Sequence, residues 1–169
     1  MKKYVFLAFF ALIAFVVKAQ DESGDLVKEG QQMPAFTIVN DNGTQVSSSS
    51  LKRKVILVNF FATWCPPCQK ELAEVQKMLW PKYKDNKDFV LLVIGREHTD
   101  VELQKYNEKK GFTFPLYPDK NRAIYGAFAK NLIPRSYLVD KTGKVVYATK
   151  GYSDEEFAEL MKRIEAALK

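Results

Sequence analysis

The most informative segment of this sequence is Val55-Ile56-Leu57-Val58-Asn59-Phe60-Phe61-Ala62-Thr63-Trp64-Cys65-Pro66-Pro67-Cys68. Its first part, Val55 to Phe61, is nearly continuous in apolar residues, as expected for a strand that helices bury on both faces. A helix is predicted from about Pro66 to Leu79, because proline is favoured in a first helical turn and Trp80-Pro81 should end the helix. Two thiols therefore stand where a strand passes into a helix.

The spacing of these cysteines predicts a redox pair. Side chains at i and i+3 of a first helical turn come close enough to form a small disulfide ring. Cys65 would lie at the helix N-terminus, where free N–H groups and the helix dipole favour a thiolate, so it is predicted to be the attacking nucleophile. Cys68, shielded by the helix body, would be the resolving thiol. Pro66 and Pro67 have no N–H to donate to sulfur, which indicates a less depressed thiol pKa and a more reducing couple.

The pair has three other possible explanations. A purely structural disulfide across so few residues would constrain little chain entropy. Half of a metal site would need ligands from a second chain, because two cysteines and one histidine cannot build a four-ligand zinc site. A chance pair of buried thiols is the third. We predict no metal and no cofactor, since the disulfide itself is the redox centre.

The rest of the chain indicates one α/β domain over residues 34–169. Strands at 35–39 and 44–46 flank Asp41-Asn42-Gly43, which is a hairpin signal. Strands are expected at 89–95, 136–139 and 144–149, and helices at 100–110, 121–129 and from 154 to the C-terminus. This order predicts a three-layer sandwich: a mixed central sheet flanked by helices, with an N-terminal β-hairpin.

The N-terminus resembles an export signal. Lys2 and Lys3 precede an apolar run of 14 residues, 4–17, which is shorter than the roughly 20 residues that span a membrane. We expect a signal peptide over residues 1–19 with cleavage after Ala19, then a flexible leader over 20–33. An uncleaved anchor is the alternative, because Lys18 is an unusual residue so near the cut. The expected location is exported, periplasmic or extracytoplasmic, with no stable membrane span after cleavage.

Charge argues against a nucleic-acid partner. Removing residues 1–19 removes three lysines and no acid, which lowers the formal charge from +6 to +3. The other lysines alternate with acidic residues, and no block of five like charges exists.

The segment from Val58 to Glu71 resembles the active site of thioredoxin-like proteins, and more narrowly of the exported TlpA/ResA-type thiol-disulfide oxidoreductases. Residues 33–38 (Met-Pro-Ala-Phe-Thr-Ile) and 133–140 (Ile-Pro-Arg-Ser-Tyr-Leu-Val-Asp) agree with it. The resemblance covers roughly residues 29–168. It implies a thioredoxin-like fold, and substrate-binding residues at the positions Trp64, Pro66, Pro67, Ile133 and Pro134. Pro134 would be a cis-proline facing the redox pair, although an ordinary proline at a strand entry is the alternative.

One departure from the family pattern concerns chemistry. Ordinary thioredoxins carry a buried aspartate where this chain has Asn59, and an amide cannot serve as a base. The substitute suggested by the resemblance is Glu97, as a possible proton-transfer group; the other reading of Glu97 is a solvent-facing loop residue. His98, the only histidine, is expected to be a loop residue near the rim of the site.

The predicted function is reduction of disulfides in exported proteins. The resemblance implies protein thiol or disulfide substrates, with cytochrome c maturation as a plausible setting, and recycling by a membrane thiol-transfer electron donor. A disulfide oxidase or isomerase is the close alternative. A thiol peroxidase is a weaker one, because its Pro-x-x-x-Thr-x-x-Cys pattern is absent. A non-catalytic binding module is the remaining class.

Overall fold

The computed structural model describes residues 24–39 and 43–169. The expected signal peptide and its cleavage site lie outside this part, as do Asp41 and Asn42 of the expected turn. A five-stranded sheet forms the centre, in the order β5-β4-β3-β6-β7. Its strands are β3 (Val55–Phe61), β4 (Phe89–Arg96), β5 (Leu116–Asp119), β6 (Arg135–Val139) and β7 (Val145–Lys150).

The central strand, β3, is buried along its whole length. It pairs in parallel with β4 and antiparallel with β6. Because β5 is parallel to β4 while β7 is antiparallel to β6, the sheet is mixed, as the sequence predicted. The carboxyl end of β3 leads directly to Cys65.

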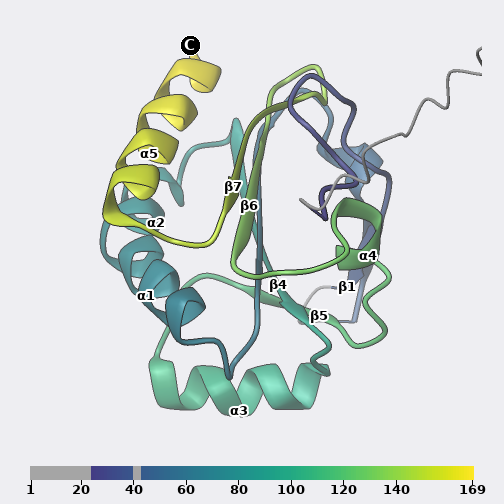
Figure 1. Ribbon diagram of the computed structural model, residues 1–169, viewed down its shortest axis with the longest axis vertical. Helices are drawn as coiled ribbons and strands as arrows, with labels where there is room; N and C mark the ends of the chain where they lie inside the picture. The colour runs from purple at the N-terminus through teal and green to yellow at the C-terminus, as the bar shows by residue number, and fades with distance from the viewer. Residues whose placement is uncertain (1–23, 40–42) are drawn as a thin grey trace, which may run out of the picture.

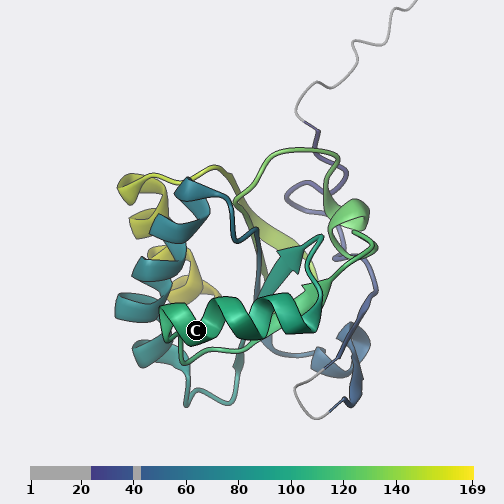
Figure 2. The same ribbon diagram turned by 90° about the horizontal axis from the view of Figure 1, so that it is seen from below.

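Helices cover both faces of the sheet. Figure 1 shows α1 (Pro66–Glu74), α2 (Trp80–Tyr83) and α5 (Asp154–Leu168) on one side, with α4 (Tyr125–Phe128) on the other. Figure 2, seen from below, shows the same separation, with α3 (Asp100–Lys110) lying across one end of the sheet. A cluster of buried apolar side chains fills each interface. The predicted three-layer sandwich is confirmed.

The N-terminal hairpin is also confirmed. β1 (Thr37–Val39) pairs antiparallel with β2 (Gln45–Ser47), and Ile38 stands opposite Val46. A short 3-10 helix, Ser48–Leu51, follows β2. Ile38 is buried, so the hairpin adds to the face that α4 covers.

Strand β5 was missed by the sequence analysis. Its sequence, Leu116-Tyr117-Pro118-Asp119, contains a proline, which argues against a central strand. The structure places β5 at the edge of the sheet, where only β4 is its neighbour. An edge strand tolerates the missing N–H of Pro118, because no partner lies on its outer side.

The helix after the cysteines is longer than predicted. α1 passes into a π-helical turn, Val75–Leu79, and then into α2. The N–H of Trp80 donates to the carbonyl of Val75, five residues back. This wider turn accommodates Pro81 in the first turn of α2, so the proline continues the helical segment instead of ending it at Trp80.

The helix predicted over 121–129 is shorter, covering only Tyr125–Phe128. Arg122 has a left-handed backbone, with φ of 57°, which interrupts a right-handed helix. The buried carboxylate of Asp119 accepts from the N–H groups of Ile124 and Tyr125, 3.0 and 2.8 Å away, and fixes the later start.

The described part of the expected flexible leader, from residue 24 on, lies against the domain. Asp25 forms a β-bridge with Ala129, Gln32 forms one with Lys144, and Val27 is 6% exposed. Asp25 also pairs with the guanidinium of Arg135, a side chain buried in the domain. A buried cation needs an opposite charge, and the sequence analysis did not anticipate one, because arginine is normally exposed. Residues of the 24–33 segment therefore contact the domain.

Replacing this carboxylate tests the attachment. Asp25→Ala removes a carboxylate that pairs with the buried guanidinium of Arg135, and should lower the free energy of unfolding by about 3 kcal/mol. Urea unfolding measures the difference. Asp88→Ala, which removes an exposed ion pair with Lys141 at 3.9 Å, should change it by less than about 1 kcal/mol. Equal effects of the two substitutions would contradict the role of Asp25.

Candidate active site

The two cysteines form a disulfide at the start of α1, with their Cα atoms 5.3 Å apart. Cys65 is the N-cap residue of the helix, and its Sγ accepts the N–H of Cys68 at 3.3 Å. Cys65 is 4% exposed and Cys68 is completely buried. The two sulfurs therefore differ in access, and the first also faces the positive end of the helix.

The loop that faces the disulfide contains Ile133 and Pro134, and the peptide bond between them is cis. The carbonyl oxygen of Ile133 lies 3.8 Å from Sγ of Cys65. Four other carbonyls of this loop accept hydrogen bonds from the protein, at residues 130, 131, 132 and 134. The backbone on both sides of Ile133 is thus held in place, while its own carbonyl faces the redox pair.

Trp64 lies beside Cys65 with 61% of its surface exposed. The guanidinium of Arg96 lies 5.6 Å from its ring centre and 5.2 Å from that of Tyr125. The hydroxyl of Tyr125 in turn donates to the carbonyl of Leu132 at 2.7 Å. Arg96 and Tyr125 therefore connect the two loops that flank the disulfide. Pro66 and Pro67, between the cysteines, are exposed.

Glu97 belongs to an exposed ion-pair cluster. Its carboxylate lies 3.1 Å from Arg96 and 3.5 Å from Arg122, and its side chain is 42% exposed. The structure therefore shows Glu97 paired with two guanidinium groups at the end of β4, with its side chain partly in solvent.

The buried acid is Glu71, which the sequence analysis did not single out. It is 3% exposed, on α1, one turn after Cys68. Its carboxyl accepts from the side-chain amide of Asn59 at 2.9 Å and from the hydroxyl of Ser136 at 3.0 Å. Burial raises the pKa of the Glu71 carboxyl to about 7, against the lowering effect of these hydrogen bonds. A signal was present: Asn59 in an apolar strand requires a polar partner.

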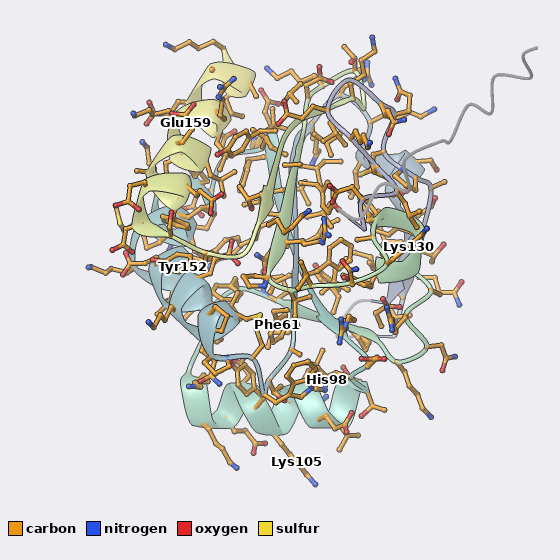
Figure 3. All side chains as sticks on the ribbon, viewed as in Figure 1. Phe61, His98, Lys105, Lys130, Tyr152 and Glu159 are labelled. Atoms are coloured by element: carbon orange, nitrogen blue, oxygen red, sulfur yellow. A yellow bond between two sulfur atoms is a disulfide. The ribbon has the colours of Figure 1, made fainter. Side chains whose placement is uncertain are left out.

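His98 is buried, although it was expected at the rim. Its Nε2 accepts the N–H of Thr63, two residues before Cys65, at 3.0 Å. Its ring lies 6.4 Å from that of Phe61, centre to centre, and Figure 3 shows both residues above α3. Burial lowers the pKa of His98, so the neutral ring that can accept this bond is favoured. His98 therefore fastens the loop that precedes the cysteines.

Comparison with known protein families shows which family this chain belongs to. The family model described as Redoxin matches residues 28–165. The chain belongs to the Redoxin family. Thiol-disulfide oxidoreductase ResA of Bacillus thuringiensis (strain Al Hakam) is 33% identical over 127 residues, covering 75% of this chain and 72% of the relative. The Bacillus subtilis ResA is 26% identical over 129 residues, covering 76% and 71%.

Similarity to solved structures agrees with the family assignment. A Bacteroides thetaiotaomicron protein that carries the name protein disulfide isomerase superposes with a TM-score of 0.82 and 38% identity, over 86% of this chain and 92% of that one. A Chlorobium tepidum protein named thiol:disulfide interchange protein DsbE gives 0.71 and 25%, over 85% and 99%. The redoxin is therefore a TlpA/ResA-type thioredoxin-like protein. Its activity is thiol-disulfide exchange with protein thiols and disulfides, and protein-disulfide reduction is the enzyme class that these relatives support.

The pKa of Glu71 makes stability depend on pH with a definite sign. The folded pKa, about 7, lies above the ordinary 4.5, so the contribution of Glu71 is fully present below pH 4.5 and lost as the pH rises through 7. Relative to Glu71→Gln, the native protein should therefore lose about 3 kcal/mol of unfolding free energy between pH 4 and pH 8. Urea unfolding at both pH values measures this. The exposed Glu155→Gln serves as control, and an unchanged difference for Glu71→Gln would contradict the burial argument.

Proposed function

We propose that this redoxin is an extracytoplasmic protein-disulfide reductase whose nucleophile is Cys65. The observation that carries the proposal is the unequal position of the two sulfurs: Cys65 is the N-cap of α1 and is 4% exposed, whereas Cys68 is 0% exposed. An incoming disulfide can reach Cys65, with the exposed Trp64 on one side and the carbonyl of Ile133 on the other. An extended substrate segment pairs with the backbone of Ile133 beside Pro134, and the exposed Pro66 and Pro67 form the remaining edge.

The reaction transfers two electrons in two exchange steps. The Cys65 thiolate attacks one sulfur of the substrate disulfide, which forms a mixed disulfide and releases the other substrate sulfur as a thiolate that takes up a proton. Cys68, deprotonated, then attacks Sγ of Cys65. The mixed disulfide breaks, the second substrate sulfur leaves as a thiolate that takes up a proton from solvent, and the Cys65–Cys68 disulfide remains. The substrate is reduced and the dithiol of the enzyme is oxidised.

The second step needs a base for Cys68, and we assign that role to Glu71. Both side chains are buried, on the same helix and one turn apart. A carboxyl with a pKa of about 7 is ionised in a useful fraction at neutral pH, and its basicity approaches that of a thiolate. Asn59 and Ser136 hold the carboxyl in place without competing for the proton, because neither is a base at this pH.

The setting of the reaction is part of the proposal. Among the described residues no helix is long and apolar enough to cross a membrane. The apolar run at 4–17 and the export signal that it resembles support an extracytoplasmic location, with cleavage after Ala19. Outside the cytoplasm, thiols are not kept reduced by glutathione, so a membrane thiol-transfer protein would return the oxidised enzyme to the dithiol form. Thiols of apocytochrome c are a plausible substrate.

A disulfide isomerase or oxidase is the second candidate, because the Bacteroides thetaiotaomicron neighbour carries an isomerase name. The reduction potential of residues 20–169 separates the two. Pro66 and Pro67 offer no N–H to the thiolate, so we expect a potential near or below about −270 mV, measured by equilibration with dithiothreitol buffers. A potential near about −120 mV, that of a strong oxidant, would overturn the reductase assignment.

The same preparation tests the two cysteine roles. Cys68→Ser should accumulate a mixed disulfide with a substrate protein, visible on non-reducing gels, because nothing releases it. Cys65→Ser should form none and should reduce no insulin disulfide. A Cys65→Ser variant with unimpaired activity would return the protein to the class of non-catalytic binding modules.

The two candidate acids can be compared directly. Glu71→Gln should slow disulfide reduction at pH 7 at least about tenfold, since it removes a general base. Glu97→Gln should leave the rate within about twofold, as expected for loss of an exposed ion pair. Stopped-flow exchange between pH 5 and 9 measures both. The opposite ranking would restore Glu97 as the proton-transfer group.

A further inference from the structure

A row of polar side chains crosses the sheet opposite Glu71. Asn59 on β3 pairs with Ser136 on β6, and Ser136 pairs with Thr149 on β7. Directly paired residues of antiparallel strands project to the same face. Asn59 and Ser136 bond to Glu71, so the third member, Thr149, continues the row from the carboxyl toward the edge strand.

Two atoms of this row have no hydrogen-bond partner within the described part of the chain. They are Oδ1 of Asn59 and Oγ1 of Thr149, on side chains that are 1% and 8% exposed. Buried polar atoms are nearly always paired, with protein or with ordered water. The buried Oγ1 of Thr149 therefore points to a partner that the described residues do not supply.

A small cavity lies at the outer end of the row. It has a volume of about 10 Å³ and is lined by Glu71, Thr149, Tyr152 and Glu156, among others. A space of roughly this size holds one water molecule. Glu156 is exposed, so the far side of the cavity borders solvent. Tyr152, which lines this cavity, is labelled in Figure 3 near the start of α5.

We propose that this cavity binds one internal water, held by Thr149, through which Glu71 exchanges its proton with solvent. The inference deepens the proposed function, since it explains how a completely enclosed base regains its ionised form between turnovers. The proton taken from Cys68 passes from the Glu71 carboxyl to the water and from the water to solvent beside Glu156. No electron moves in this step. Thr149 acts as a positioning residue, because its hydroxyl holds the water and never touches the substrate.

Titratable groups on three elements face Glu71. Glu156 lies on α5, Tyr152 lies in the preceding turn, and the cysteine pair lies on α1. The negative charge of Glu156 opposes ionisation of Glu71, whereas a water donating to the carboxylate favours it. Tyr152 stays neutral across the physiological range, because burial and Asp154 raise its pKa.

Thr149→Val tests the water site, since it keeps the shape of the side chain and removes the hydroxyl. The Glu71 carboxyl is titrated by ¹³C NMR in the full oxidised protein, where no turnover is needed. We expect the ionised fraction of Glu71 at pH 7 to fall at least about fivefold, the loss of one hydrogen bond to a charged group. The pH–rate profile should shift to higher pH accordingly. Thr149→Ser should restore both. Thr149→Ala, which leaves room for the water, should have the smaller effect of the two hydroxyl-free variants.

Two results would overturn the proposal. One is a titration of Glu71 in Thr149→Val that matches the native protein. The other is an equal shift in Thr149→Ser, which would indicate a packing effect independent of the hydroxyl. Thr113→Val, on the loop before β5, controls for loss of a threonine elsewhere. The proposed exchange activity is tested separately, because an active Cys65→Ser variant would contradict it. The titration of Glu71 in the oxidised protein would still decide whether the water site exists.

Discussion

The carboxyl group of Glu71, buried between α1 and the sheet, determines how the helix that begins with the two cysteines is attached to the sheet. Burying the Glu71 carboxyl removes it from water, which is unfavourable for the charged form and explains its raised pKa. Asn59 on the central strand and Ser136 on the neighbouring strand compensate for this loss, because both donate hydrogen bonds to the carboxyl. These bonds tie the first turns of α1 to the middle of the sheet. Because Cys65 and Cys68 begin the same helix, the position of the disulfide follows from that attachment.

The disulfide also divides two tasks between two environments. In the proposed reaction, electrons are exchanged at Cys65, beside the carbonyl of Ile133. The proposed proton transfer takes place where Cys68 and Glu71 are both buried. A fully buried thiol is a poor target for foreign disulfides, which protects the resolving step from side reactions. The helix N-terminus favours a thiolate at Cys65. In the proposed mechanism, the Glu71 carboxylate takes the proton of Cys68.

The fold and the redox pair could be predicted from sequence because their signals are local. The apolar strand and the two cysteines at i and i+3 each occupy a few adjacent residues. β5 was missed because its tolerance of Pro118 depends on an edge position that only the completed sheet defines. The attachment of residues 24–33 was missed for a similar reason: Asp25 and Arg135 are 110 residues apart in sequence, and neither indicates the other.

Glu71 was missed for the same reason, because its polar partners Asn59 and Ser136 are 12 and 65 residues away in sequence. Where ordinary thioredoxins place an aspartate on the central strand, this chain has Asn59, and the acid has moved to the facing helix. A glutamate on α1 has the reach to meet the same strand, and Asn59 now donates to it. The proton acceptor proposed for this chain therefore lies between α1 and the sheet. A search confined to the strand end finds Glu97, whose two guanidinium partners hold it in an exposed cluster. The proposed mechanism needs a carboxyl group between α1 and the sheet. In the sequence, the sign of such a group is Asn59, a polar residue in an otherwise apolar strand.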